Sequence, residues 1–186
     1  FSECLVQCLI CLKMSFLKSV EDSSTTVLRA LLAQYKSNPQ QYDLEETDIY
    51  GNTPLLKACY LGRRDHVDLL LKRGANLKAM NYLGQNALTL ATYCGSLDVV
   101  RLLLRFRSYT DFNKSSIVPA LCVACLRRNH TLINYFRRFP SSEEELTTAH
   151  GMTPAQISEC VEVCDKVYGR QSSQGASSSG AAYRMR

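Results

Sequence analysis

Histidine is scarce in this 186-residue chain, and its three copies, His66, His130 and His150, lie far apart. None of them is paired at helical spacing with a carboxylate or a cysteine. A glycine-rich phosphate loop, a nucleophile elbow and an HExxH motif are missing as well. We therefore expect no catalytic residues, no bound metal and no cofactor, and we predict that the chain is not an enzyme.

Long apolar runs are also missing. No stretch reaches the roughly 18 residues that a membrane-spanning helix needs, although 46% of the residues are hydrophobic. We therefore expect a soluble globular protein with no transmembrane segment.

Cysteine, in contrast, is abundant, with nine copies that include the CxxC pairs Cys8/Cys11 and Cys122/Cys125. A structural zinc site usually needs two such pairs brought together. Here the pairs lie toward opposite ends of the chain, so we favour reduced thiols that pack as small hydrophobic side chains over a zinc site. Reduced thiols suit a reducing compartment, and we expect a cytoplasmic or nuclear protein.

A period of 33 residues is the strongest positive signal. The segment Gly51 to Leu55, with the sequence GNTPL, returns as GQNAL from Gly84 to Leu88. The same shift relates further residues, namely Ala58 to Ala91, Gly62 to Gly95 and Val67 to Val100. A fixed period of this length is typical of a stacked array, in which each unit buries its apolar face against its neighbours.

These residues resemble the ankyrin repeat, in which a turn is followed by two antiparallel helices and the sequence Thr-Pro-Leu-His-x-Ala. Residues 48–80 fit this pattern closely. Thr53 is expected to cap the first helix and Pro54 to occupy its first position. Gly62 is expected to end that helix, and the second helix to run from His66 to Lys72. The resemblance implies an all-α solenoid.

We predict about five units in an array of residues 14–168. Their ranges are 14–47, 48–80, 81–113, 114–147 and 148–168. The second and third units are well formed, whereas the first needs a six-residue insertion to keep the register. The fourth unit is degenerate, because Ile117 and Arg128 stand where its two glycines are expected.

The family's motif histidine is absent from every unit. Its positions hold Leu56, Thr89, Cys122 and Gln156. In the family that histidine helps to tie neighbouring turns together, so its loss is expected to weaken the array.

Two segments lie outside the array. Residues 1–13 are interpreted as an extension that is not native or that belongs to a larger upstream region, with a signal peptide as the alternative. Residues 169–186 are rich in Ser, Gly and Ala and are interpreted as a disordered tail or linker.

Acidic residues are nearly absent from positions 101 to 138, which contain eight basic residues and one acidic residue, Asp111. This stretch fits an electrostatic site for acidic protein, anionic lipid or nucleic acid. It also fits cations at the ends of second helices, where they offset the negative helix terminus, and we favour this second interpretation. Since the net charge is only +5 and no nucleic-acid motif occurs, we expect no nucleic-acid partner.

The resemblance implies that partners bind to a concave face made of turn tips and the exposed sides of the first helices. Mapping the period onto the chain gives the candidate partner-binding residues. They are Tyr50, Asn52, Lys57, Tyr60, Leu61, Tyr82, Leu83, Gln85, Leu90, Tyr93 and Arg127. The recurring tyrosines suit a protein interface, although Tyr60 and Tyr93 also suit the seam between adjacent repeats.

Two functions are compatible with these observations. The first is a protein–protein interaction module, an adaptor or regulatory scaffold for an unidentified protein partner, either monomeric or part of a longer chain. The alternative is a non-catalytic segment of a larger enzyme, channel or ubiquitin-ligase adaptor.

Overall fold

The computed structural model describes residues 15–141 and 146–168. The predicted extension of residues 1–13 and the predicted tail of residues 169–186 lie outside these ranges. Within them, no helix is long and apolar enough to cross a membrane.

The described residues are organised as consecutive helix pairs. The pairs are α2 (Phe16–Glu21) with α3 (Thr25–Ser37), α4 (Pro54–Tyr60) with α5 (Arg64–Lys72), α6 (Ala87–Cys94) with α7 (Leu97–Leu103), and α9 (Ala120–Leu126) with α10 (His130–Phe136). The remaining elements are the 3-10 helix η1 (Pro39–Gln41), α8 (Tyr109–Lys114) and α12 (Pro154–Tyr168). No strand forms in the described residues, where Met80 and Asn86 make an isolated bridge.

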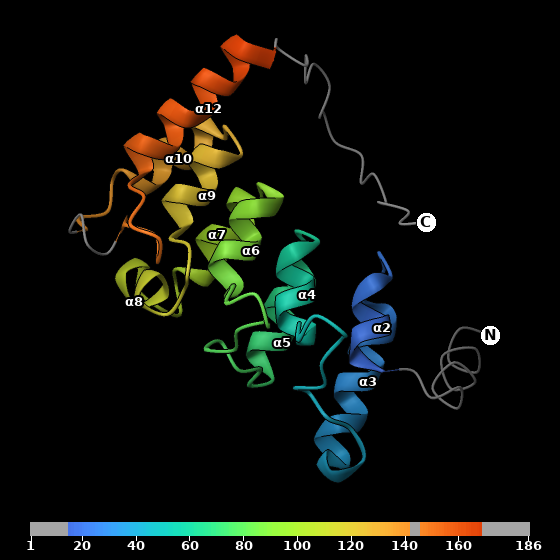
Figure 1. The fold of residues 1–186 in the computed structure, drawn as a ribbon. Helices are drawn as coiled ribbons and strands as arrows, with labels where there is room; N and C mark the ends of the chain where they lie inside the picture. Colours follow the sequence, from blue (N-terminus) through green and yellow to red (C-terminus); the bar gives the residue numbers. More distant parts are fainter. Residues whose placement is uncertain (1–14, 142–145, 169–186) are drawn as a thin grey trace.

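The pairs stack into a solenoid with two layers of helices. The first helices, α2, α4, α6, α9 and α12, contact one another in that order and form a curved row (Figure 1). The second helices α3, α5 and α7 contact one another behind the row, and α10 packs on α9. The all-α solenoid that the ankyrin resemblance implies is therefore present.

Local chemistry explains where the first helices begin. The Thr53 hydroxyl accepts a hydrogen bond from the Leu56 N–H at 3.3 Å, and Pro54 follows as the first helical residue. In the next repeat, Asn86 caps α6 by accepting from the Thr89 N–H at 3.0 Å. Each cap satisfies a backbone donor that the helix itself leaves free.

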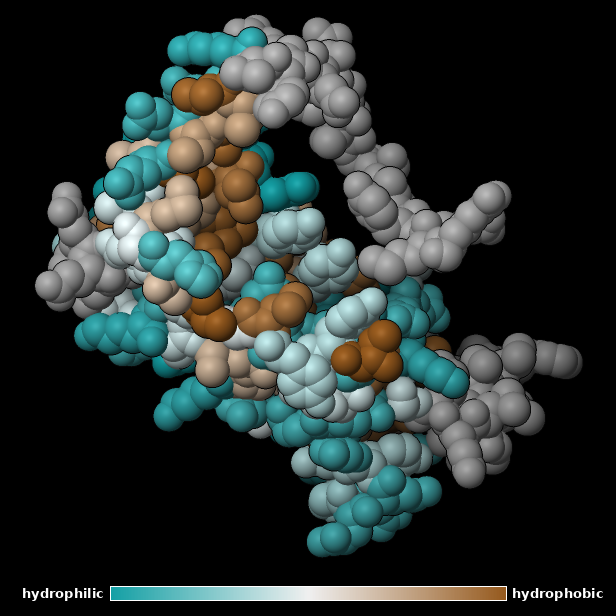
Figure 2. All heavy atoms as spheres, in the orientation of Figure 1, coloured by the Kyte–Doolittle hydropathy of each residue, from teal (hydrophilic) through white to brown (hydrophobic). Residues whose placement is uncertain are grey.

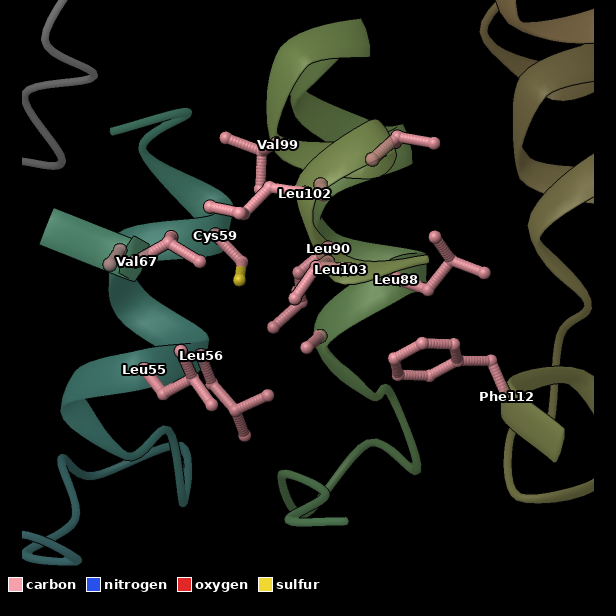
Figure 3. Packing of buried hydrophobic residues seen from close by; sticks show 14 of the residues in the cluster. Leu55, Leu56, Cys59, Val67, Leu88, Leu90, Val99, Leu102, Leu103 and Phe112 are labelled. Atoms are coloured by element: carbon pink, nitrogen blue, oxygen red, sulfur yellow. The ribbon is translucent and has the colours of Figure 1, made fainter. Parts of the chain in front are cut away.

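Helix α8 is a difference from the sequence-based prediction, because it crosses the boundary of the third unit (81–113) and the fourth (114–147), where no helix was predicted. Ser108 caps it by accepting from the Asp111 N–H at 3.1 Å. The Ser-x-x-Asp spacing is a helix-start signal, but the 33-residue period indicates no helix at this position. The Phe112 side chain of α8 is fully buried and points toward Leu88 of α6 (Figure 3).

The core lies between successive helix pairs. Leu55, Leu56 and Cys59 of α4 point toward the side chains of the next pair, including Leu90 and Leu103 (Figure 3). All five are buried, and burial of one leucine side chain contributes about 1.5–3 kcal/mol relative to exposure. The apolar face of each pair is thus completed only by its neighbour.

Two of the residues that replace the motif histidine connect successive repeats. The Thr89 hydroxyl lies 2.9 Å from the Ser116 hydroxyl and donates weakly to the Val118 carbonyl at 3.4 Å. The Cys122 thiol donates to the Leu146 carbonyl at 3.1 Å. Leu56, in contrast, is completely buried and contributes packing. The loss of the histidine is therefore partly compensated by other polar side chains.

Arg128 adopts a left-handed backbone conformation, with φ of 55°. The equivalent residues one and two repeats earlier are Gly95 and Gly62, with φ of 84° and 68°. A side chain with a Cβ is strained in this region, whereas glycine is not. The fourth unit thus keeps the turn geometry of its neighbours at a cost in conformational energy.

We predict that Arg128→Gly is more stable than Arg128→Ala by about 1 kcal/mol, because only glycine relieves the left-handed strain. Both variants lose the ion pair between Arg128 and Asp165 equally, so their difference isolates the backbone effect. Urea denaturation at constant m-value measures it. Equal stability of the two variants would show that the turn is not strained.

Candidate partner-binding surface

Polar side chains shape the turn tip at the start of each well-formed repeat. Asp48 Oδ1 accepts from the backbone N–H groups of Tyr50 and Asn52, both at 2.9 Å. Burial raises the pKa of Asp48, but these hydrogen bonds and the nearby Lys57 charge outweigh burial and lower that pKa overall. In the next repeat, Asn81 Oδ1 holds the tip in the same way, accepting from Leu83 and Gln85.

Successive tips are stacked on one another. The Tyr82 N–H donates to the Tyr50 carbonyl at 3.0 Å, and the Tyr82 ring lies against the backbone of Gly51. A Cβ added to Gly51 would lie 2.7 Å from that ring, and φ of this residue is 77°. Glycine is therefore required there both for its conformation and for the close approach.

Apolar side chains remain exposed on these tips. The exposed residues are Ile49, Tyr50, Tyr82, Leu83, Ile117 and Met152. Tyr82 keeps 76% of its surface exposed even though one face of its ring covers Gly51. Their recurrence from tip to tip produces an apolar band along one edge of the solenoid, and such bands mark interaction sites in soluble proteins.

A stack of three side chains lies at the opposite ends of the first helices. The rings of Tyr60 and Tyr93 are stacked with centroids 6.0 Å apart, and the guanidinium of Arg127 lies 4.7 Å from the Tyr93 centroid. We call these residues the Tyr60–Tyr93–Arg127 ladder. Tyr60 and Tyr93 still expose 43% and 40% of their surfaces. Their rings therefore both fill the seam between adjacent repeats and contact solvent.

The apolar surface continues toward the last helices. Leu61 is exposed beside the ladder, as are Leu126 at the end of α9 and Val163 on α12. Figure 2 shows hydrophobic residues gathered over the part of the molecule that α9 and α12 occupy. Exposed apolar side chains are thus also present on α9 and α12, beyond the two well-formed repeats.

The structure divides the predicted partner-binding residues into three groups. Seven are exposed, namely Tyr50, Tyr60, Leu61, Tyr82, Leu83, Tyr93 and Arg127. Three are half-buried and engaged within the chain. Asn52 bonds to Asp48 and Asn81, Gln85 accepts from Asn81, and Lys57 lies 3.3 Å from the Glu21 carboxylate.

The prediction for Leu90 is wrong, because its side chain is only 3% exposed. Helix α6 contacts α4 on one side and α9 on the other, and Leu90 is covered in the core between repeats. In contrast, Ile117 and Met152 are exposed at tips that the sequence did not mark as binding positions. Both residues lie close to a predicted repeat start, and this position could have identified them as tip residues.

The cysteines in the described ranges are not grouped as metal ligands. Among the residues that the structure describes, no cluster of three or more His, Cys, Asp or Glu side chains could hold an ion. Burial raises the pKa of the Cys59 and Cys94 thiols and raises that of Cys122 to about 12. These three thiols are therefore protonated at neutral pH, and the buried Cys59 and Cys122 pack as small apolar side chains.

Comparison with known proteins gives the family. Residues 16–116, more than half of the chain, match the family model described as ankyrin repeats in three copies. The chain belongs to the ankyrin-repeat family. Ankyrin repeats imply protein–protein interaction, so the exposed tips and the ladder are candidate contacts for a protein partner.

Several curated proteins are similar to this ankyrin-repeat chain. It is 56% identical over 119 residues to the DNA replication inhibitor plutonium of Drosophila melanogaster, covering 63% of this chain and 68% of that protein. It is 30% identical over 105 residues to the mouse protein fem-1 homolog A-like, covering 56% of this chain and 16% of that protein. A probable E3 ubiquitin-protein ligase of Oryza sativa subsp. japonica, XBOS33, is 46% identical over 56 residues, or 30% of this chain and 11% of the ligase.

We predict that Tyr60→Ala and Tyr93→Ala are energetically coupled, because each substitution removes the same ring stack. A double-mutant cycle on the free energy of unfolding should give a coupling of about 0.5–1.5 kcal/mol. Tyr60 with Tyr82 is the matched control, since Tyr82 lies at a tip and not at a helix end. Additive effects in both pairs would show that the contact between the Tyr60 and Tyr93 rings contributes no coupling energy to the array.

Proposed function

We propose that the chain is a non-catalytic protein-binding module, an adaptor or regulatory scaffold, whose partner contacts the turn tips and the Tyr60–Tyr93–Arg127 ladder. The observation that carries this proposal is the recurrence of exposed tyrosines in successive repeats, with Tyr60 and Tyr93 at the same repeat position and Tyr50 and Tyr82 near matching turn tips. Helix and turn formation do not require tyrosine at these positions. Tyrosine instead buries a large area on binding at low entropic cost, which favours an interface role.

The ladder supplies a prepared contact. Tyr93 is held between the Tyr60 ring and the Arg127 guanidinium, so its conformation is restricted before a partner arrives. Binding then costs less side-chain entropy than it would for freely rotating rings. The backbone link between the Tyr50 and Tyr82 tips restricts the tip band in the same way.

We further propose that this module acts in the inhibition of DNA replication, in the cytoplasm or the nucleus. Support comes from the 56% identity to a protein named DNA replication inhibitor plutonium, over 68% of that protein's length. The described cysteines are free thiols, and three of them, Cys59, Cys122 and Cys125, are buried, which suits a reducing compartment. In this proposal the chain inhibits by occupying a protein partner and performs no reaction itself.

A second candidate is the ankyrin segment of a larger ubiquitin ligase. The similarity to XBOS33 favours it, although that similarity covers 11% of the ligase. The sequence of the full-length transcript distinguishes the two candidates. A ligase domain in the same reading frame would favour the second, whereas a transcript that encodes ankyrin repeats without one would favour the first.

We predict that this chain restores the inhibition of DNA replication in Drosophila embryos that lack plutonium, and that the Tyr60→Ala/Tyr93→Ala variant does not. The measurement is the DNA content of individual nuclei. Equal expression of the two proteins is checked by immunoblot, because unequal amounts would imitate a loss of function. Rescue by neither protein would contradict the proposed role in replication.

We also predict that the same double variant binds proteins recovered with the wild-type chain from those embryos about thirtyfold more weakly, corresponding to about 2 kcal/mol. The loss should change little with salt, since the removed contacts are largely apolar. Arg137→Glu/Arg138→Glu is the control at exposed helix ends and should have a smaller effect. A partner that ignores the tyrosines but dissociates at about 300 mM salt, roughly twice physiological ionic strength, would place binding on the basic residues.

A further inference from the structure

We propose that a depression on the second-helix layer binds an acidic segment of a partner protein, separately from the tips and the ladder. Residues of α5, α7 and α10 and the chain directly after α7 and α10 form this depression, which has a volume of about 480 Å³. Its charged lining consists of Arg64, Arg101, Arg105 and Asp98. We call it the arginine depression.

The charges in the arginine depression are unbalanced, with three guanidinium groups against one carboxylate. Arg64 pairs with Asp65, its neighbour in sequence, at 3.3 Å, and both side chains are more than half exposed. No carboxylate in residues 15–141 or 146–168 forms an ion pair with Arg101 or Arg105. Two arginines are thus available to a negatively charged ligand.

Helix-end electrostatics do not explain the whole set. Arg101 lies in the last turn of α7 and Arg105 directly follows that helix, where cations offset the negative helix terminus. Arg64, however, is the first residue of α5, where the helix terminus is positive and a cation is unfavourable. The convergence of Arg64 with the two arginines near the end of α7 therefore points to a ligand.

The remaining lining is largely apolar and partly fixed. The rings of Tyr135 and Phe139 meet edge to face with centroids 5.5 Å apart, and the Arg101 guanidinium lies 5.7 Å from the Tyr135 centroid. Leu102 is buried beside them. A depression of this size with apolar walls and a few converging polar groups suits one or two side chains of a peptide.

The combination defines the ligand's chemistry. Carboxylates bind the planar fork of arginine through paired, charge-assisted hydrogen bonds, and Arg105 is free to make them. An apolar side chain next to the carboxylates can cover Tyr135 and Phe139. We therefore infer a segment in which Asp or Glu residues flank one large apolar residue.

Nucleic acid fits this site less well. Arg101 and Phe139 already contact the Tyr135 ring, which limits stacking of a base on it. The residues also form a compact depression, whereas a single strand needs a basic groove that follows its backbone.

The probe for a direct test is a fluorescently labelled peptide containing Glu-Glu-Phe-Glu-Glu, titrated with the full chain while fluorescence anisotropy is measured. We expect Arg101→Gln/Arg105→Gln to weaken binding by about tenfold or more, because loss of even one charged hydrogen bond is worth about that much. A peptide with Gln in place of Glu should bind the wild-type chain comparably weakly. The matched control is Lys36→Gln/Lys78→Gln, which removes the same charge from exposed positions elsewhere and should retain binding.

Several results would overturn the proposal. They are the absence of peptide binding to the wild-type chain, equal weakening by the arginine and lysine variants, and tighter binding of a single-stranded oligonucleotide that depends on Arg101 and Arg105. Urea unfolding midpoints show whether the arginine double variant is folded. The single variant Arg105→Gln keeps the contact between Arg101 and Tyr135, so it tests the charge of Arg105 with less risk to the fold. Tyr60→Ala/Tyr93→Ala should bind the peptide normally, so failure here is distinguishable from failure of the proposed function.

Discussion

Contact between successive turn tips is the constraint on which the rest of the array depends. The Tyr82 ring lies on Gly51, and Ile117 is in equally close contact with Gly84 one repeat later. Backbone hydrogen bonds from Tyr82 to Tyr50 and from Ile117 to Gly84 accompany these contacts. Because these tips rest on the ones before them, the number of residues between successive tips is restricted, and the helices that follow are stacked in register.

The sequence was sufficient to predict the elements determined by local chemistry. Thr53 and Pro54 start α4 as expected. Gly62, which was expected to end this helix, lies two residues after it and has the positive φ of the turn that follows. The 33-residue period then placed α6 and α7. Local signals could not show which side of α6 its neighbours cover, which is why Leu90 was assigned to the surface. Burial depends on contacts with α4 and α9, which no single repeat contains.

The degenerate fourth unit shows that stacking can maintain a turn without its preferred residue. Arg128 retains the left-handed conformation of Gly62 and Gly95, and the hydrogen bond from the Asn129 N–H to the Ala124 carbonyl closes the turn as in the earlier repeats. Neighbouring helices bury Ala124 completely and hold the chain in place. Packing between repeats thus offsets a local strain that an isolated unit would relieve by changing conformation.

The two proposed surfaces belong to different helices of the same repeats. Tyr60 and Tyr93 lie at the ends of α4 and α6, whereas Arg64 and Arg101 lie on α5 and α7. The chemistry of the surfaces also differs, since one is mainly aromatic and the other mainly cationic. A partner segment on one surface would leave the other accessible, because the arginine depression and the ladder have no residue in common. If the same partner occupied both, the second contact would become intramolecular and would raise the overall affinity without any change in either site.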